Sequence, residues 1–198
     1  PDGALFKLPF EVLQYNDRLL VEDYSIRYTS NLGFVHYSYK LSAPTNKVHI
    51  YAPKYLNTST KSEIRSRPSF LQGERTEAEI ISQLFPSKLF NDETLNKSQF
   101  IKTSDKAKIL HLAMHAEVNN DFPVFNRMLF SNNLNKEEDH LYLEELYGLS
   151  LSAELAILSA CNTGTGLEKN GSLESFQRAF TFAGVPATVA SLWEVPDA

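Results

Sequence analysis

The chain has 198 residues, 42% of them hydrophobic, which is enough to bury the core of one domain. A formal net charge of −5 disfavours non-specific binding of nucleic acid, and no apolar run reaches the roughly 18 residues that a membrane-spanning helix needs. The single cysteine cannot form an internal disulfide, so we expect a reducing, cytoplasmic compartment.

The first third of the chain is predicted to contain strands and a loop. Residues 8–30 begin with a short apolar turn and continue as a strand-like run. Residues 31–41 fit a strand, because alternate residues are apolar, and they also fit a helix capped by Ser30. Residues 47–53 predict a strand, and the polar residues 57–69 predict a loop.

A helix is predicted over residues 76–85, with the sequence TEAEIISQLF. Thr76 and Glu79 have the spacing of a capping box at its start, and Pro86 follows its last residue. The apolar stripe that we expect to face the core consists of Ile80, Ile81, Leu84 and Phe85.

Three apolar segments of the second half predict buried strands: residues 107–116, 154–160 and 187–193. Residues 131–140 are polar and predict a solvated loop. Short apolar strands that alternate with helices predict an α/β fold with a mainly parallel sheet covered on both faces.

A second helix is predicted over residues 172–184, capped by Ser172. Gly184 stands just beyond its last turn, where a left-handed residue often ends a helix. One face of this helix carries the apolar residues Leu173, Phe176, Ala179, Phe180 and Ala183.

Reactive side chains follow two of the predicted strands: His115 ends one, and Cys161 follows another. Ligands of open α/β sheets bind beyond the carboxyl ends of the strands. The spacing of 46 residues is close to the roughly 50 that separate histidine from cysteine in caspases. A nearby histidine raises the thiolate fraction and protonates the leaving amine, and the glycine-containing turn NTGTG leaves backbone N–H groups for an oxyanion.

The residues alone leave other roles open. A lone cysteine at the end of an apolar strand usually packs in a core. His111 lies four positions before His115 on the same strand face, so either has the spacing of a base; His115 is preferred because it ends the strand. Residues 164–172 hold the glycines of a phosphate loop without its lysine, and the two histidines lack the glutamate of a zinc site, so we expect no cofactor and no metal.

In this order, the segments HLAMHA, LSACNTGTG, SFQRAFTFAGV and ASLWEVPD resemble the CHAT domain. CHAT is a bacterial caspase-like domain usually found behind tetratricopeptide repeats and related to caspases and separase. The upstream segments PDGALFKLPFEVL, DYSIRYTSN and GERTEAEIISQLF extend the resemblance over nearly the whole chain.

The resemblance implies a three-layer α/β/α fold of the caspase-haemoglobinase type. We expect residues 1–198 to form a single CHAT domain that is cut at both ends, with tetratricopeptide repeats upstream of this chain. His115 matches the general base of the family and Cys161 its nucleophile. The oxyanion hole of related peptidases implies the backbone N–H groups of Ala116 and Cys161.

The segment after the last strand usually lines the S1 pocket in these peptidases, and Trp193, Glu194 and Asp197 fall there. Asp197 is suited to pair with a basic side chain at P1, since arginine and carboxylate form bidentate pairs. The other reading places Trp193 in the core and makes Asp197 a helix cap.

The expected function is therefore a cysteine endopeptidase that hydrolyses peptide bonds of a protein substrate and is regulated by repeat domains or partner proteins. The rival hypothesis is a catalytically idle CHAT-like module for protein interaction or signalling. Retention of both His115 and Cys161 favours the enzyme. Neither nucleic acid nor a membrane is an expected partner.

Overall fold

The computed structural model describes residues 8–28, 48–55, 72–92, 95–119, 121–130, 137–159, 167–169, 172–174 and 176–190. The predictions for residues 31–41, 57–69 and 191–193 lie outside the described residues. So do four of the candidate site residues, namely Cys161, Trp193, Glu194 and Asp197.

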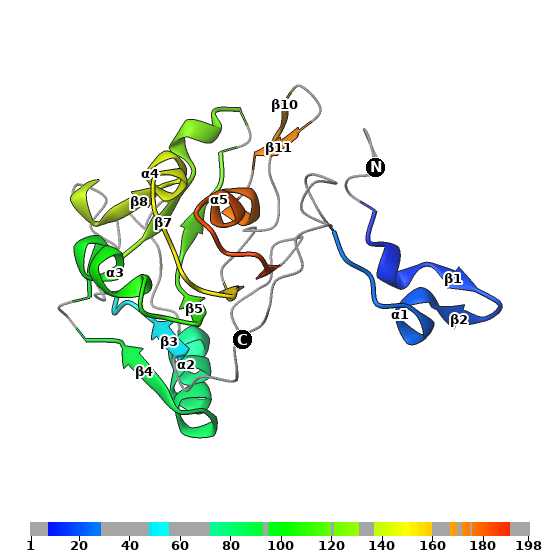
Figure 1. Cartoon of the computed structure of the whole chain (residues 1–198), viewed down its shortest axis with the longest axis horizontal. Coiled ribbons are helices and arrows are strands. Elements are labelled where there is room, and N and C mark those ends of the chain that lie inside the picture. The colour runs from blue at the N-terminus through cyan, green and yellow to red at the C-terminus, as the bar shows by residue number, and fades with distance from the viewer. Residues whose placement is uncertain are drawn as a thin grey trace, which may run out of the picture.

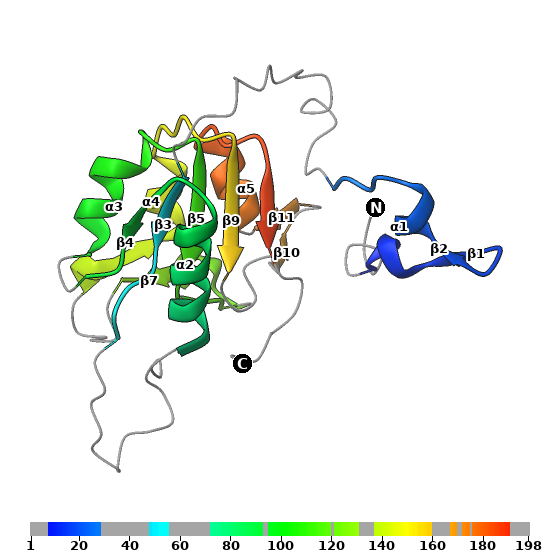
Figure 2. The same ribbon diagram turned by 90° about the horizontal axis from the view of Figure 1, so that it is seen from below.

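Residues 8–28 form a small unit that lies beside the main body in Figures 1 and 2. It consists of the 3-10 helix η2 (Phe10–Val12), the strands β1 (Gln14–Tyr15) and β2 (Arg18–Leu19), and the helix α1 (Leu20–Asp23). Asn16 and Asp17 join the strands with φ of 52° and 61°, as a two-residue hairpin turn requires. The strand-like run predicted here is wrong in extent, because each strand has only 2 residues.

The centre of the fold is a parallel sheet of 5 strands: β3 (Val48–Tyr51), β4 (Ser87–Phe90), β5 (Ile109–Ala113), β9 (Leu155–Ser159) and β12 (Thr188–Ala190). Their order in space is β12-β9-β5-β3-β4, and all four neighbouring pairs are parallel (Figure 2). The chain therefore extends the sheet first to one side of β3 and then to the other, so the order reverses between β3 and β5.

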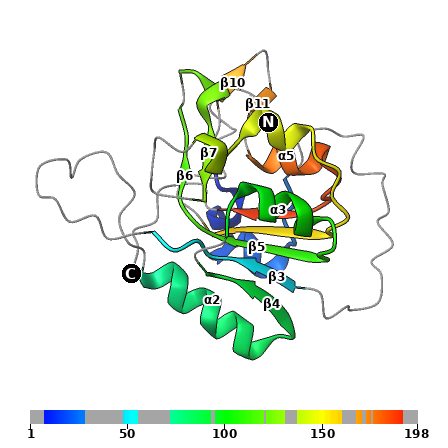
Figure 3. The ribbon, with the colours of Figure 1, turned by 90° about the vertical axis from the view of Figure 1, so that its left-hand side faces the viewer.

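Helices cover both faces of this sheet, which confirms the predicted three-layer α/β/α architecture. Figure 3 shows α2 (Gln72–Leu84) on one side, with α3 (Lys97–Ser104) and α5 (Phe176–Phe182) on the other. The short helix α4 (Leu143–Tyr147) belongs to the second side, where Leu143 and Leu146 join the same apolar cluster as Phe180 of α5.

A second, antiparallel sheet follows directly from β5. It contains β6 (Ala116–Glu117), β7 (Arg127–Leu129) and β8 (His140–Tyr142) in that order. The 3-10 helices η4 (Pro123–Phe125) and η5 (Glu137–Asp139) precede β7 and β8. A separate hairpin pairs β10 (Leu167–Lys169) with β11 (Ser172–Glu174).

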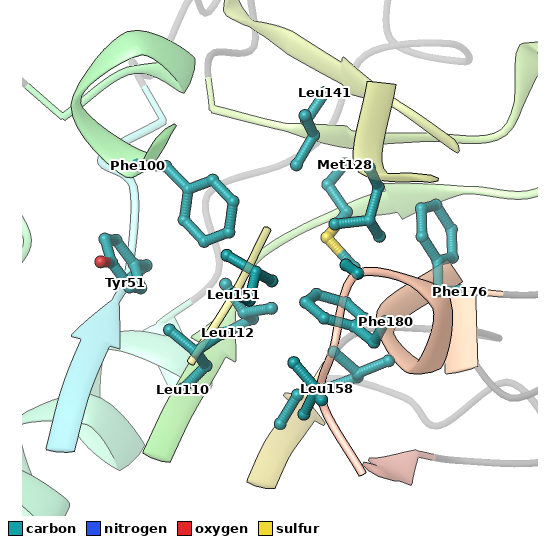
Figure 4. Close-up of a cluster of buried hydrophobic side chains, with 14 of the residues drawn as sticks. Tyr51, Phe100, Leu110, Leu112, Met128, Leu141, Leu151, Leu158, Phe176 and Phe180 are labelled. Carbon is teal, nitrogen blue, oxygen red and sulfur yellow. The ribbon is translucent and has the colours of Figure 1, made fainter. Parts of the chain in front are cut away.

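The side chains of the parallel strands alternate between two apolar clusters, as strand geometry demands. Leu110 and Leu112 of β5 belong to the large cluster with Phe180, and Figure 4 shows these side chains gathered with their neighbours. Ala113 belongs to the small cluster with Ala78 of α2 on the opposite face. The large cluster includes the fully buried Tyr51, Phe100, Met114, Met128, Leu141 and Phe176.

The helix predicted over 76–85 begins four residues earlier, at Gln72, so a capping box at Thr76 is wrong. The predicted stripe is also wrong, because Ile80, Leu84 and Phe85 are exposed and only Ile81 packs toward the sheet. Ala78, which the predicted stripe leaves out, is fully buried against the sheet.

The helix predicted over 172–184 begins at Phe176, because residues 172–174 form β11. A cap at Ser172 is therefore wrong, although four residues of the predicted apolar face are buried as expected: Phe176, Ala179, Phe180 and Ala183. The loop predicted over 131–140 ends in β8, where His140 is fully buried.

Gly184 ends α5 as predicted, with a φ of +105°. Its N–H donates to the Thr181 carbonyl at 3.1 Å, and the Val185 N–H donates to the Phe180 carbonyl at 2.9 Å. These two bonds define a Schellman motif, which turns the chain from α5 toward β12.

Candidate functional site

The candidate site lies at the carboxyl ends of the central strands, where the strand order reverses. Tyr55 follows β3 by four residues and His115 follows β5 by two residues. In open α/β sheets the crevice beyond such a reversal is the usual place for a ligand. The topology therefore places these two residues where chemistry is expected.

His115 stands at the junction of the two sheets. The parallel strand β5 ends at Ala113, so the prediction that the strand reaches His115 is too long by two residues. Met114 is fully buried in the core, while His115 is partly exposed and Ala116 begins the antiparallel sheet. The buried Met114 before His115 and the pairing of β6 with β7 after it restrain the backbone of His115.

Tyr55 contacts His115 through both its hydroxyl and its ring. The His115 N–H donates to the Tyr55 Oη at 2.8 Å, and the hydroxyl donates to the Leu129 carbonyl at 2.8 Å. The two rings lie 4.7 Å apart between centroids, at an interplanar angle of 52°. Tyr55 is only 4% exposed, so its own position is fixed by packing.

The ladder between β6 and β7 decides where the Ala116 N–H points. The Leu129 N–H donates to the His115 carbonyl at 3.0 Å, and Ala116 is the partner of Met128. Because hydrogen-bonded and non-bonded pairs alternate in an antiparallel ladder, Ala116 and Met128 form a non-bonded pair. The Ala116 N–H therefore points away from β7.

His111 occupies a different environment from His115. It is 3% exposed beneath α2, and its Nε2 lies 3.2 Å from Glu77 Oε1. The two atoms are within ion-pair distance, although the imidazole is not directed well enough for a hydrogen bond. Ser159, at the end of β9, donates to Glu77 Oε2 at 2.7 Å. His111 is therefore much less accessible to a ligand than the partly exposed His115.

The pKa of Glu77 reflects these contacts. Burial by itself raises the pKa of the carboxyl group, but the contacts with His111 and Ser159 outweigh burial and leave the pKa below its ordinary value. Glu77 is consequently ionised at neutral pH, and it joins α2 to the middle of β5 through His111 and to the end of β9 through Ser159.

A second polar cluster lies in the antiparallel sheet that begins at Ala116, and within it His140 is buried while Arg127 and Glu117 are partly exposed. Arg127 Nε donates to Glu117 Oε2 at 2.7 Å, and its Nη1 lies 3.2 Å from His140 Nδ1. Burial and the charge of Arg127 lower the pKa of His140. Within the described ranges, no group of three His, Cys, Asp or Glu side chains is placed to hold a metal ion.

Sequence patterns did not point to Tyr55, Glu77 or Ser159. Each contacts a residue between 34 and 82 positions away, so only the strand order reveals the contact. Of the predicted site residues, His115 and Ala116 are described and adjacent. The candidate phosphate loop at 164–172 lies largely outside the described residues.

Comparison with known proteins gives one positive result. A family model described as the CHAT domain matches residues 1–198, the whole chain. No curated protein matches the chain at a significant level. In the part of the chain that the structure describes, no helix has the length and apolar composition that crossing a membrane requires.

Proposed function

The chain belongs to the CHAT domain family, and from this membership we propose that it is a cysteine endopeptidase in which His115 and Cys161 form the catalytic dyad. The family match covers all 198 residues, and the proposal rests on the resemblance of CHAT domains to caspases. The proposal assigns the base to His115, the nucleophile to Cys161 and the oxyanion donors to the backbone of Ala116 and Cys161.

The register between β5 and β9 is the observation that carries this proposal. These adjacent strands pair residues 46 positions apart throughout, from Ile109 with Leu155 to Ala113 with Ser159. His115 and Cys161 are also 46 positions apart, each two residues beyond the last pair. Neighbouring strands lie about 4.8 Å apart, so chains that leave the same edge at the same offset are suited to bring a base and a nucleophile together.

The proposed reaction uses these groups in turn. His115 takes the proton of the Cys161 thiol, and the thiolate attacks the carbonyl carbon of the peptide bond. The N–H groups of Ala116 and Cys161 stabilise the oxyanion, which is worth about 3 kcal/mol for each donor. The imidazolium of His115 then protonates the leaving amine, and water hydrolyses the thioester.

Substrate selection in this proposal belongs to the segment after β12. Trp193, Glu194 and Asp197 line the S1 pocket, and Asp197 pairs with a basic side chain at P1. A P1-scanning peptide library tests this assignment: Asp197→Asn lowers cleavage after Arg and Lys if it is right, while a wild-type protein without preference for Arg or Lys overturns it.

The proposed setting is a cytoplasmic protein in which tetratricopeptide repeats or partner proteins control access to the dyad. A protein or peptide is the substrate, and the reaction needs no metal and no cofactor, because the thiolate and imidazole supply both nucleophile and proton transfer.

The decisive experiment compares cleavage of a proteome by the wild-type protein, Cys161→Ala and His115→Ala. The control is Lys102→Ala, at an exposed position of α3. We expect new protein termini with the wild type and the control, and none with either dyad variant. Identical termini from wild type and Cys161→Ala would remove Cys161 from the role of nucleophile.

A further inference from the structure

We propose that Tyr55 is a positioning residue for the dyad, which holds the backbone and the ring of His115 and thereby aims the Ala116 N–H. This inference rests on the proposed function, since it concerns the base of that reaction. It is carried by the contacts that Tyr55 makes with His115 and Leu129, both of which are described residues.

The Tyr55 hydroxyl is inserted into the ladder between β6 and β7. In a regular hydrogen-bonded pair, His115 and Leu129 would exchange two N–H to carbonyl bonds. Only one is made directly, from the Leu129 N–H to the His115 carbonyl at 3.0 Å. In place of the other, the hydroxyl accepts from the His115 N–H at 2.8 Å and donates to the Leu129 carbonyl at 2.8 Å.

This insertion has a geometric consequence for the site. A bridging hydroxyl makes one side of the pair wider than a direct bond would, so the chain at His115 stands away from Leu129 on that side. The peptide that follows carries the Ala116 N–H. The direct bond from Leu129 holds the carbonyl of this peptide, and the Tyr55 hydroxyl holds the His115 N–H just before it, so the two bonds together set the direction of the Ala116 N–H.

The Tyr55 ring restrains the imidazole as well. The ring centroids of Tyr55 and His115 lie 4.7 Å apart, within the range of favourable aromatic pairs. Tyr55 is itself held rigidly, because Ala52 and Pro53 before it are buried and the Ala52 N–H donates to the Phe90 carbonyl at 2.9 Å. Lys54 is the exposed residue of this short segment.

Tyr51, the last residue of β3 and four positions before Tyr55, provides a matched control. It is fully buried, its hydroxyl lies 2.9 Å from Thr103 Oγ1, and it stacks on Phe90 at 4.8 Å. Tyr51→Phe removes one buried hydroxyl, as Tyr55→Phe does. A merely structural role predicts similar effects for the two variants, whereas a positioning role predicts a difference confined to Tyr55→Phe.

The first measurement is the rate of alkylation by iodoacetamide as a function of pH. Cys161 is the only cysteine of the chain, so the rate reports on this thiol alone. We expect Tyr55→Phe to shift the profile toward the pKa of about 8.5 of a free thiol and to lower the rate at pH 7 about tenfold. We expect Tyr51→Phe to stay within about twofold of wild type. Coincident profiles for the two variants would overturn the inference.

The second measurement is hydrogen exchange at the His115 amide, which does not depend on peptidase activity. We expect its protection to fall in Tyr55→Phe and to persist in Tyr51→Phe; equal protection in both would overturn the inference. If Tyr55→Phe does not fold, 4-aminophenylalanine at position 55 replaces it, since its amine restores a donor and an acceptor. We then expect protection and alkylation near the wild-type values, and failure of this rescue in a folded protein counts against the inference.

These readouts separate two failures. If Cys161→Ala cleaves like wild type, the proposed peptidase is wrong, and the amide of His115 still decides whether Tyr55 holds it. If Cys161→Ala is inactive while Tyr55→Phe behaves like Tyr51→Phe, the peptidase stands and the positioning role is wrong.

Discussion

The Ser159 hydroxyl donates to the Glu77 carboxylate at 2.7 Å, which joins residues 82 positions apart. Glu77 belongs to α2 and Ser159 is the last residue of β9, so the bond fixes the end of the strand that leads to Cys161. This polar contact fixes the carboxyl end of β9, which lies between the apolar core and the candidate site.

We expect Ser159→Ala to lower the free energy of unfolding by about 1 kcal/mol, because a hydrogen bond to a partly exposed carboxylate is lost. Ser82→Ala is the control, since the Ser82 hydroxyl donates within α2 to the Glu79 carbonyl at 2.7 Å and does not reach the sheet. We expect this control to stay within about 0.5 kcal/mol of wild type. Urea unfolding measures both, and equal midpoints for the two variants would contradict the prediction.

The lowered pKa of Glu77 predicts an acid limb in the stability profile. The unfolded chain binds the proton near the ordinary pKa of 4.5, whereas the folded chain still excludes it. The stabilisation is therefore complete above pH 4.5 and is lost as the pH falls through the folded value. We expect Glu77→Gln to reduce the dependence of the unfolding free energy on pH between about pH 5 and about pH 3. An unchanged slope would show that Glu77 titrates alike in both states.

The lowered pKa of His140 affects the free energy of unfolding at a higher pH than the lowered pKa of Glu77 does. Burial is the main cause and the charge of Arg127 the second, and together they outweigh the acidic neighbours Glu117, Asp139 and Glu137. The unfolded chain binds a proton near pH 6.5 while folded His140 stays neutral, so its stabilisation is present above pH 6.5 and lost as the pH falls through the folded pKa.

His140→Asn checks this second limb, because its amide oxygen can replace Nδ1 beside Arg127 without titrating. We expect the variant to lose less stability than wild type between pH 7 and pH 5.5, the range just around the ordinary histidine pKa of about 6.5. Parallel curves for the two proteins would exclude His140 as the titrating group.

Gly184 is expected to tolerate no side chain. Its φ is +105°, and a Cβ would lie 2.7 Å from the Leu151 carbonyl oxygen. We expect Gly184→Ala to cost about 2 kcal/mol or more, from backbone strain and this clash. Gly148→Ala is the control, because its φ is −84° and the nearest atom would lie 3.4 Å away. Thermal unfolding that ranks the two variants in the reverse order would refute the argument.

The parallel strands were predictable because their apolar runs are continuous. β5 and β9 fall within the predicted segments 107–116 and 154–160. By contrast, β4 was missed, since its sequence SKLF has two polar residues and lies at the edge of the sheet. Edge strands need less apolar surface, so the pattern that identifies a central strand is weak there.

The helix α3 was also missed, although a local signal exists. The Asn96 side chain accepts a hydrogen bond from the Gln99 N–H at 2.8 Å, a regular helix cap. Phe100 is the one large apolar side chain that α3 buries completely, so its apolar periodicity is too faint to detect. For α2, a plausible capping box inside the helix was mistaken for its start.

Part of the candidate site followed from sequence and part required the fold. His115 was identified by its position after an apolar strand, and the register of β5 with β9 gives its spacing to Cys161 a structural reason. Tyr55 and Glu77 carry no local pattern that marks them. Their roles depend on the order of the strands, which brings β3 beside β5 and α2 across that face.

The reversal of strand order between β3 and β5 also bears on how the molecule folds. The strands β3 and β5 pair residues 61 positions apart, so a long loop must close before Tyr55 and His115 can meet. Loop closure of this kind slows folding in proteins rich in non-local pairings. During synthesis, β3, β4 and β5 leave the ribosome before β9, so the segment that holds His115 can pair before the segment that holds Cys161 has been made. For the proposed peptidase, this order of synthesis means that the catalytic dyad is incomplete until the chain beyond β9 has been made.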